Sequence, residues 1–135
     1  MDNLTPERRS ANMSQIRSQG TSPEMTVRWL VHGMGYRYRL HVASLPGKPD
    51  IVLPRLKRII EVRGCFWHQH PGCTDSHIPK SRVQYWAPKL ERNQRRDVEN
   101  GRQLRRLGWR VCVVWECETK AQLRLLRRLA RFLAA

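Results

Sequence analysis

The stretch from Pro49 to Cys73 constrains the fold of this chain more than any other, because it contains two short apolar runs on either side of a turn. Asp50 follows a proline, which disfavours helix at the preceding position, and the run Ile51–Leu53 is typical of a short strand. Pro54 marks a turn, and the apolar residues of the segment 59–62 predict a second strand. The pattern therefore predicts two adjoining strands joined by a turn.

Acidic and basic side chains accompany these two strands. Glu61 and Arg63 are two residues apart, so they lie on the same face of the second strand, while Asp50 stands at the entry of the first. Two carboxylates on adjoining strands suit a hard divalent cation such as magnesium, which also binds water and phosphate oxygens. A proline before an aspartate is equally common in ordinary turns, so this pattern alone leaves a metal site and a plain turn open.

The composition narrows the class of partner. With 135 residues and no internal repeat, residues 1–135 fit one domain whose core needs no disulfide bonds. The net charge of +15 and the pI near 11.1 indicate a polyanionic partner. We expect nucleic acid rather than a membrane, because no apolar run approaches the roughly 20 residues of a spanning helix and no signal peptide is recognisable. We therefore expect a cytoplasmic protein.

The cysteines and histidines have the spacing of a metal site. A chain without secretory features is expected to keep its thiols reduced, which favours metal ligation over disulfides. Three soft or borderline ligands follow the spacing C-x4-H-x2-C, and a fourth comes after a strand predicted from Arg110 to Trp115. These ligands are Cys65, His70, Cys73 and Cys117. A Cys3His set predicts a structural zinc site, since no position is left for catalysis. We expect Cys112 to be an ordinary buried thiol.

Aromatic and basic residues surround this loop. Phe66 and Trp67 are consecutive and cannot both face a core easily, so we expect them to stack against bases. Trp86 opens a helix and fits either the core or the same aromatic group. Lys80 and Arg82 lie in a polar loop, where we expect contacts with phosphates.

Three helices and one further strand complete the predicted fold. Thr21 to Gly33 reads as a helix in which Thr21 and Glu24 form a capping box and Trp29 lies on the buried side. The alternation from Tyr36 to His41 predicts a strand antiparallel to the one beginning at Asp50. Strands flanked by helices on both faces predict a three-layer α/β fold with a mixed central sheet and an attached zinc loop.

The two later helices carry most of the remaining apolar residues. A long helix from Trp86 to Leu107 has an inward stripe that includes Asn93 and Asp97, and buried polar groups need partners. Asp97 either orients His68 or pairs with Arg63. The last helix is expected from Lys120 to Phe132, with four leucines inward. They are Leu123, Leu126, Leu129 and Leu133.

Two resemblances bear on function. The pattern P-D-x10-E-x-R resembles the PD-(D/E)xK signature of restriction-like nucleases, with Arg63 where lysine usually stands. The blocks SLPGKPDIV, GCFWHQHPGC and GWRVCVVWEC occur in the order found in the very-short-patch-repair (Vsr) endonucleases, to which the chain is similar from about Arg9 to Glu118. Members of that family nick DNA at thymine-guanine mismatches. The resemblance implies a fold of restriction-endonuclease type.

The resemblance also implies roles for residues around the two strands. Magnesium would be held by Asp50 and the backbone carbonyl of Val62, and Glu24 would act as an acid beside it. His68 would be the general base, because an imidazole titrates near the working pH. Arg63 stays protonated and would stabilise charge on the phosphate.

This sequence departs from its relatives at three places. Relatives usually carry an acid or histidine at position 63 and an apolar residue at position 61. Glu61 is therefore either a second metal ligand or a strand residue paired with Arg63. Relatives also often have cysteine and then histidine where this chain has His70 and then Cys73.

For DNA contact, the resemblance implies an aromatic wedge and an arm. The wedge would consist of Phe66, Trp67 and Trp86. The arm would be residues 1–20, in which Met13 and Ile16 either press into the minor groove or pack against the domain. Asn93 and Asp97 belong to the motif NQRRD, which would support the site.

The expected partner is double-stranded DNA with a T:G mismatch, nicked 5′ to the thymine by a monomer near the nucleoid. A functional link to a cytosine-5 DNA methyltransferase and to mismatch-repair proteins is part of this expectation. Two alternatives stay open: a restriction-like nicking endonuclease without mismatch specificity, and a non-enzymatic DNA-binding module stabilised by zinc.

Overall fold

The computed structural model describes residues 21–134, so Met13, Ile16 and the rest of the expected arm lie outside the described residues. The strands are β1 (Arg39–Leu40), β2 (Ile51–Leu53), β3 (Arg58–Arg63) and β4 (Arg110–Trp115). The long helices are α2 (Ser22–Gly33), α3 (Val83–Arg106) and α4 (Gln122–Ala134). Short 3-10 turns occur at Thr74–Ser76, Lys80–Arg82 and Glu116–Lys120.

The four strands form one mixed sheet in the order β1-β2-β3-β4. β1 and β2 are antiparallel, as are β2 and β3, whereas β4 runs parallel to β3. A parallel neighbour needs a crossover connection, and the chain makes it through α3. The strand expected from Tyr36 to His41 is regular only at Arg39–Leu40, and its alternation between half-buried and exposed residues is confirmed from Tyr36 to Leu40 but not at His41, which is half-buried.

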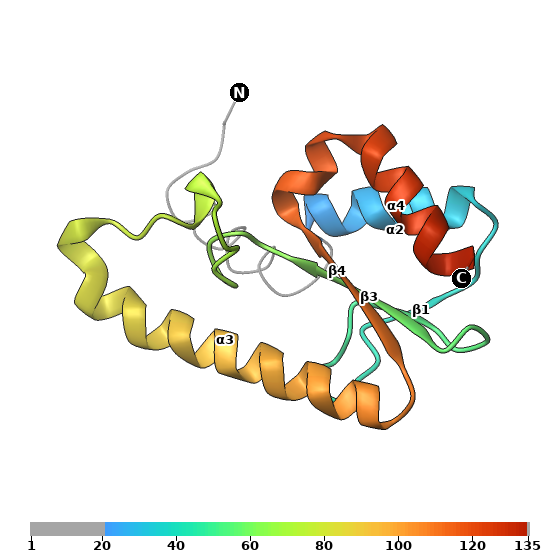
Figure 1. Cartoon of the computed structure of the whole chain (residues 1–135), viewed down its shortest axis with the longest axis horizontal. Helices are drawn as coiled ribbons and strands as arrows, with labels where there is room; N and C mark the ends of the chain where they lie inside the picture. The colour runs from blue at the N-terminus through green and yellow to red at the C-terminus, as the bar shows by residue number, and fades with distance from the viewer. Residues whose placement is uncertain (1–20, 135) are drawn as a thin grey trace, which may run out of the picture.

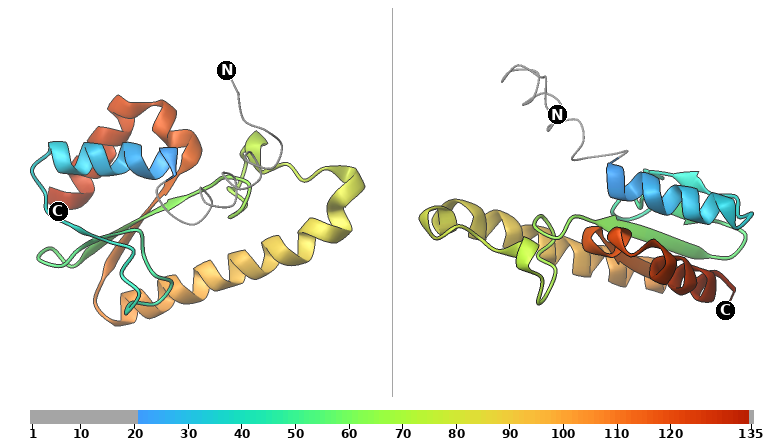
Figure 2. Two further views of the ribbon diagram at one scale, coloured as in Figure 1. Left: turned by 180° about the vertical axis from the view of Figure 1, so that it is seen from behind. Right: turned by 90° about the horizontal axis from the view of Figure 1, so that it is seen from above.

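Helices cover both faces of the sheet, as the sequence predicts. α2 and α4 lie together on one face, and α3 runs along the other (Figures 1 and 2). The larger core lies on the face of α2 and α4 and includes Val31, Ile60 and Leu129. The smaller core lies on the face of α3 and is built from Val52, Ile59 and Leu104.

β2 shows how two cores share one strand. Ile51 and Leu53 belong to the larger core, whereas Val52 between them belongs to the smaller one. All three are buried, as expected for a strand with helices on both faces. The continuous apolar run that predicted this strand therefore reflects its central position between two helical layers.

Two predictions about helix faces are wrong. Trp29 is 69% exposed, and α2 buries Val27 and Val31 instead. Leu123 is 64% exposed, because α4 buries the stripe that includes Leu129. In both helices several apolar residues offered more than one stripe at helical spacing, and packing against the sheet selected one of them.

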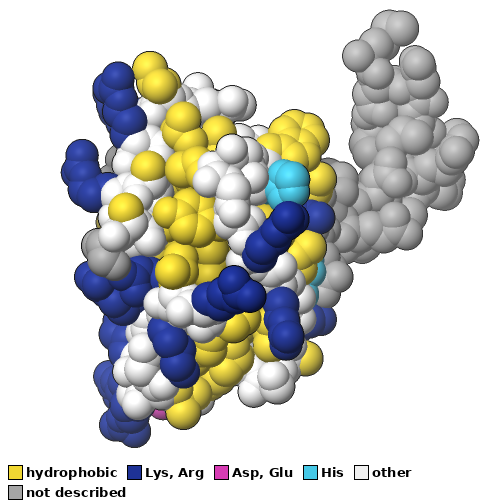
Figure 3. Space-filling model, turned by 90° about the vertical axis from the view of Figure 1, so that its right-hand side faces the viewer, with side chains coloured by type: hydrophobic (Ala, Val, Ile, Leu, Met, Phe, Trp, Pro, Cys, Tyr) yellow, Lys and Arg dark blue, Asp and Glu magenta, His cyan; other side chains and the backbone are white. Residues whose placement is uncertain are grey.

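The charged surface is mostly basic. On the face shown in Figure 3, Lys and Arg side chains surround a band of hydrophobic side chains, and hardly any acidic surface is visible. Among the helices that the structure describes, none has the length and hydropathy needed to cross a membrane. A basic surface of this kind suits a polyanionic partner.

We predict that the two leucines of α4 differ sharply in their contribution to stability. Leu129→Ala should lower the free energy of unfolding by about 2 to 5 kcal/mol, because Leu129 is fully buried and its loss leaves a cavity. Leu123→Ala on the same helix should change it by less than about 0.5 kcal/mol. Urea denaturation measures both, and equal losses would contradict the burial of α4 described above.

Candidate active site and metal centre

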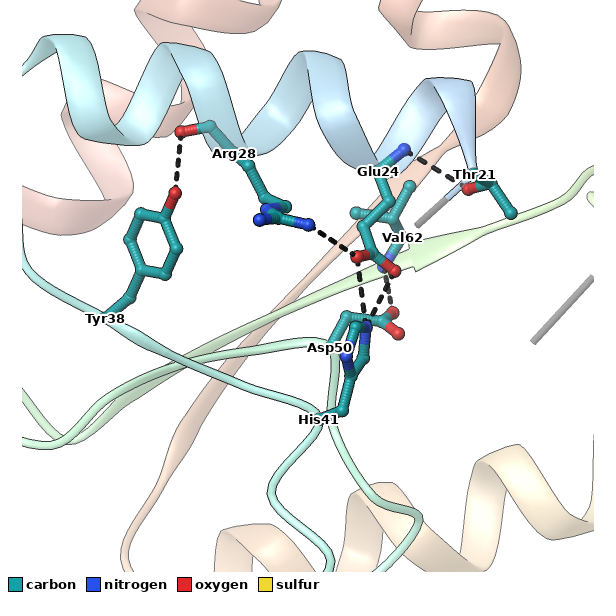
Figure 4. A network of polar contacts seen from close by, with 7 residues as sticks. All are labelled: Thr21, Glu24, Arg28, Tyr38, His41, Asp50 and Val62. Atoms are coloured by element: carbon teal, nitrogen blue, oxygen red, sulfur yellow. Dashed lines mark hydrogen bonds and ion pairs between the residues drawn. The ribbon is translucent and has the colours of Figure 1, made fainter. Parts of the chain in front are cut away.

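Asp50 stands where β2 begins, and its carboxylate is bound by the neighbouring strand. The backbone N–H of Val62 donates a hydrogen bond of 2.8 Å to Oδ2 of Asp50 (Figure 4). Ile51 pairs with Ile60, so continuing this antiparallel register places Asp50 opposite Glu61. The two carboxylates predicted on adjoining strands therefore come together at one end of the β2–β3 pair.

The environment of Asp50 disfavours its charged form. Burial raises the pKa of this carboxyl from its ordinary 3.8 to about 6, and the nearby charges of Glu24 and Glu61 add to the rise. The Val62 N–H and His41 act in the opposite direction and hold the pKa of Asp50 down in part. Asp50 has lost much of its hydration, so its charged form would be stabilised by a cation bound beside it.

Glu24 enters the site from α2 and is held by a histidine that the sequence analysis did not assign. Both carboxylate oxygens of Glu24, which is 3% exposed, lie 3.0 Å from Nε2 of His41, and Arg28 approaches to 3.7 Å (Figure 4). Thr21 accepts a hydrogen bond from the Glu24 N–H, as its capping role predicts. The carboxylate of Glu24, in contrast to its backbone N–H, contacts His41.

His41 joins Asp50 and Glu24 into one cluster. A ligand atom from each of the three lies within 4.8 Å of the others, close enough to bind one ion. His41 was missed because alternation placed it on the outer face of a strand. Its backbone is in the left-handed region, with φ of 47°, and the alternation pattern contains no signal for that turn.

A small cavity of about 150 Å³ is lined by four of the five predicted catalytic residues, Asp50, Glu61, Arg63 and His68, and by the predicted supporting residue Asp97. Two pairs of side chains are hydrogen-bonded inside it. Nη2 of Arg63 donates to Glu61 at 2.8 Å, and Nδ1 of His68 lies 2.6 Å from Oδ2 of Asp97. Of the two partners considered for Asp97, the structure shows His68. Because Asp97 binds Nδ1 of His68, the other ring nitrogen, Nε2, is available to contact another group.

Lys48 and Asn100 also line this cavity and were not singled out from the sequence. Lys48 is part of the turn before β2, and Asn100 lies one helical turn beyond Asp97 on α3. The spacing of Asn100 from Asp97 is a signal that could have identified it, because residues three apart share a helix face.

The three aromatic residues of the predicted wedge form one cluster. Phe66, Trp67 and Trp86 contact one another edge to face, with ring centroids 5.2 to 5.4 Å apart. Asn93 holds the loop from α3 by donating to the carbonyl of Trp67 at 3.2 Å. The loop after β3 and the start of α3 therefore present one half-buried aromatic surface beside His68.

The four predicted zinc ligands also come together. The ligand atoms of Cys65, His70, Cys73 and Cys117 all lie within 4.8 Å of one another. Nδ1 of His70 is 3.7 Å from Sγ of Cys65 and 3.5 Å from Sγ of Cys117, close to the roughly 3.6 Å that tetrahedral zinc imposes between nitrogen and sulfur. Burial raises the pKa of the Cys65 thiol to about 12, so a thiolate there needs a cation.

The remaining predicted residues lie apart from the cavity. Lys80 and Arg82 are exposed on the 3-10 turn that precedes α3. Cys112 is 7% exposed within the larger core, which confirms it as a buried thiol. All four cysteines are free.

Comparison with known proteins identifies the family. Residues 1–75, more than half of the 135-residue chain, match the family model described as DNA mismatch endonuclease Vsr. The chain belongs to the Vsr family. It is therefore an endonuclease of that family, and the resemblance noted in its sequence is confirmed.

The Vsr-family relatives carry two kinds of name. "Type II nicking enzyme V.XorIIP" of Xanthomonas oryzae is 53% identical over 117 residues, which cover 87% of this chain and 85% of the relative. "Type II nicking enzyme V.NmeAIP" of Neisseria meningitidis is 42% identical over 96% of this chain and 92% of the relative. "DNA mismatch endonuclease Vsr" of Escherichia coli is 38% identical, over 87% and 74%.

The raised pKa of Asp50 predicts a pH-dependent cost to stability in the absence of magnesium. Because the pKa of about 6 in the folded state exceeds the ordinary 3.8, the folded protein binds the proton more tightly, and stability falls as pH rises between these values. Asp50→Asn removes the charge and keeps an acceptor for the Val62 N–H. At pH 7.5 this variant should unfold with a free energy on the order of 1 to 3 kcal/mol above wild type.

The advantage of Asp50→Asn should shrink towards pH 4.5, where wild-type Asp50 is mostly protonated. Urea denaturation without added magnesium at both pH values provides the measurement. A variant that is less stable than wild type at pH 7.5 would mean that burial of the Asp50 charge carries no such cost.

Proposed function

We propose that this protein nicks one strand of duplex DNA 5′ to the thymine of a T:G mismatch, in a magnesium-dependent hydrolysis. The observation that carries the proposal is the cavity in which the half-buried Asp50 meets the His68–Asp97 pair directly beside the aromatic cluster. Phe66, Trp67 and His68 are consecutive in the chain. Base recognition and chemistry would therefore act within one short loop.

The residues around Asp50 fit magnesium. The desolvated Asp50 carboxylate and the backbone carbonyl of Val62 would hold the ion, which takes few protein ligands and leaves room for phosphate oxygens. When bound, it supplies positive charge beside the scissile phosphate. Glu61 is engaged by Arg63 at 2.8 Å, which supports the reading of Glu61 as a paired strand residue rather than a metal ligand.

The chain's own residues would move the proton. Asp97 holds Nδ1 of His68, so Nε2 can accept a proton from the attacking water while the water oxygen bonds to phosphorus and the bond to the leaving oxygen breaks. Arg63 would stabilise charge on the phosphate, and its position is fixed by Glu61. Glu24, fixed by His41, would act on water at the same site.

The aromatic cluster supports selection of a weakened base pair. Inserting side chains between base pairs requires unstacking, which costs about a few kcal/mol per step and less at a mismatch. Phe66, Trp67 and Trp86 support one another edge to face, so the inserted surface would be rigid. Groove contacts must then identify thymine and guanine.

We also propose a structural zinc ion at Cys65, His70, Cys73 and Cys117. The donor set and the nitrogen–sulfur distances fit tetrahedral zinc. The ion would tie the loop that carries His68 and the aromatic pair to the turn after β4, and so reduce the entropy of that loop.

The wider biological setting belongs to the same proposal. The fold would be of restriction-endonuclease type, with a mixed sheet between helices, and the enzyme would act as a monomer in a prokaryotic cytoplasm, near the nucleoid. Deamination of 5-methylcytosine produces T:G pairs, so a cytosine-5 DNA methyltransferase would supply the substrate. Mismatch-repair proteins would be functional partners.

A second candidate is a nicking endonuclease without mismatch selection. The relatives that share 53% and 42% identity with this chain are both named Type II nicking enzymes, and the one named mismatch endonuclease shares 38%. Sequence identity to these relatives therefore does not favour mismatch selection. The two candidate functions differ in whether cleavage requires a mispaired base.

The decisive experiment compares duplexes of identical sequence with T:G, T:A and C:G at one position, in a panel of flanking sequences with and without magnesium. We expect magnesium-dependent nicking 5′ to the thymine of T:G only. Equal nicking of T:A would support the second candidate, and the absence of nicking on every duplex would reject both.

One variant separates mismatch selection from general binding within this experiment. Trp67→Ala should slow nicking of the T:G duplex far more than it weakens salt-sensitive binding to T:A, because phosphate contacts carry the non-specific affinity. Trp29→Ala, at an exposed tryptophan on α2, is the matched control and should behave as wild type.

The zinc proposal predicts one tightly bound zinc per chain by elemental analysis. Cys65→Ser or Cys117→Ser should lower the zinc content and the folded yield, because each leaves an incomplete tetrahedron. Cys112→Ser should keep one zinc, since that thiol lies in the larger core. A native protein without zinc, in which all four thiols react freely, would disprove the site.

A further inference from the structure

Lys48 is the residue of the cavity to which no role has yet been assigned. It stands two residues before Asp50 and lines the cavity together with Glu61, Arg63 and His68. It is exposed, and no residue that the structure describes forms an ion pair or a hydrogen bond with its ammonium group. Its charge is therefore available to a ligand.

The other basic side chains of the cavity are already engaged. Arg63 is bonded to Glu61 at 2.8 Å, and the two side chains are only 17% and 12% exposed. His68 is bonded to Asp97 at 2.6 Å. Lys48 is thus the cation of this cavity that can move to meet an incoming anion without giving up a carboxylate partner.

The backbone at Lys48 is in an uncommon conformation. Gly47 and Lys48 are consecutive left-handed residues, with φ of 77° and 49°. This suits glycine, whereas for lysine it costs roughly 1 to 2 kcal/mol. A residue held in such a conformation beside a cavity is a typical feature of functional sites, and it is kept there by its surroundings.

Helix α3 provides those surroundings. A Cβ atom on Gly47 would lie 2.7 Å from Nδ2 of Asn100, so the turn is pressed against the α3 side chain. The same helix carries Asp97, which binds His68. Two residues of α3, Asn100 and Asp97, therefore contact the turn that carries Lys48 and the proposed general base of the same cavity.

The charge balance of the cavity calls for a free cation. Asp50, Glu61 and Asp97 line it, and Glu24 adds its charge to the environment of Asp50. A phosphodiester entering this space meets several carboxylates, and like charges repel. A lysine ammonium is a compact charge that binds phosphate oxygens well.

We propose that Lys48 is a catalytic residue that contacts a non-bridging oxygen of the scissile phosphate and stabilises its negative charge during strand cleavage. This inference rests on the proposed nicking activity and adds a phosphate-binding residue to it. It divides the work between two cations: Arg63, which is fixed by Glu61 inside the cavity, and Lys48, which approaches from the rim.

The chain offers a matched control. Lys57 is also an exposed lysine with a left-handed backbone, φ of 56°, but it lies in the turn between β2 and β3, with Nζ 4.5 Å over the Trp109 ring. Asparagine tolerates this backbone conformation better than most residues, so Lys48→Asn and Lys57→Asn both remove an ammonium group without straining the turn. Lys48→Arg keeps the charge.

The first measurement is the single-turnover rate of nicking with saturating enzyme and magnesium. Lys48→Asn should be slower than wild type by on the order of 10²-fold, the usual loss for one group that stabilises developing charge. Lys48→Arg should recover most of the rate, to within about tenfold of wild type. Lys57→Asn should match wild type, and the thermal midpoints of both asparagine variants should be at or above that of wild type.

The second measurement needs no cleavage. A neutral methylphosphonate replaces the phosphate at the mapped nick site, and binding is measured without magnesium. Wild type and Lys57→Asn should lose about tenfold more affinity on this replacement than Lys48→Asn does, because Lys48→Asn has already lost one contact with that phosphate and Lys57 makes none.

The outcomes separate this inference from the proposed function. Wild type that nicks no duplex removes the nicking activity and the role of Lys48 with it. Wild type that nicks, while Lys48→Asn nicks equally fast or responds equally to the methylphosphonate, overturns the Lys48 inference and leaves the nicking activity in place.

Discussion

The hydrogen bond from the Val62 N–H to the Asp50 carboxylate joins β2 to β3 at the point where both strands reach the cavity. It exists only in the observed register, in which Ile51 pairs with Ile60. A shift by one residue would turn the side chains of β3 to the opposite face, and the paired Glu61 and Arg63 would leave the cavity for the side of α2 and α4. Burial of Ile59 and Ile60 in two separate cores prevents such a shift. The positions of the proposed catalytic groups are therefore consequences of core packing.

This arrangement also explains why the cation is expected at Asp50 and not at another acid of the site. Glu24 has His41, Glu61 has Arg63 and Asp97 has His68, so each of these carboxylates already lies beside a basic side chain. The bond that Asp50 accepts comes from a neutral backbone group, and its burial raises its pKa. A desolvated carboxylate without a full counter-charge is costly, and the proposed divalent cation would remove this cost and supply charge for the chemistry.

The sequence predicted the parts of the fold that depend on periodic burial. The strands around Ile51–Leu53 and Arg110–Trp115 were found because continuous apolar runs mark strands between two layers of helices. The faces of α2 and α4 were predicted only in part. Leu129 and Leu133 are buried as expected, whereas Trp29 and Leu123 belong to apolar stripes that fit a helix as well as the buried ones do. Choosing between such stripes requires the position of the sheet, which periodicity does not contain.

Only some residues of the candidate site were predicted from the sequence, for a related reason. Asp50, Glu61 and Arg63 follow from strand alternation, and His68 and Asp97 came from motifs. His41 and Lys48 were missed. Both have left-handed backbones in turns that flank the β1–β2 pair, and a positive φ at a residue other than glycine leaves little trace in a sequence.

The proposed zinc cluster and the proposed catalytic groups are linked through β4. The His70 ring stacks on the Trp115 ring with centroids 4.3 Å apart, and the guanidinium of Arg63 lies over the Trp115 ring at 5.9 Å from its centroid. Trp115 pairs with Arg63 in the parallel register of β3 and β4, so these ring contacts lie at the end of both strands. The loop that follows Arg63 carries the aromatic pair and His68 before it reaches His70.

Both ends of that loop are consequently fixed: one by the β3–β4 pairing and the other by the ligand cluster. A loop fixed at both ends has few conformations left to lose when DNA binds, and less of the binding free energy is spent on ordering it. The proposed zinc ion, although it has no open position for catalysis, would in this way contribute to the rate, because it would fix the positions of Nε2 of His68 and the edge of Trp67 before the substrate arrives.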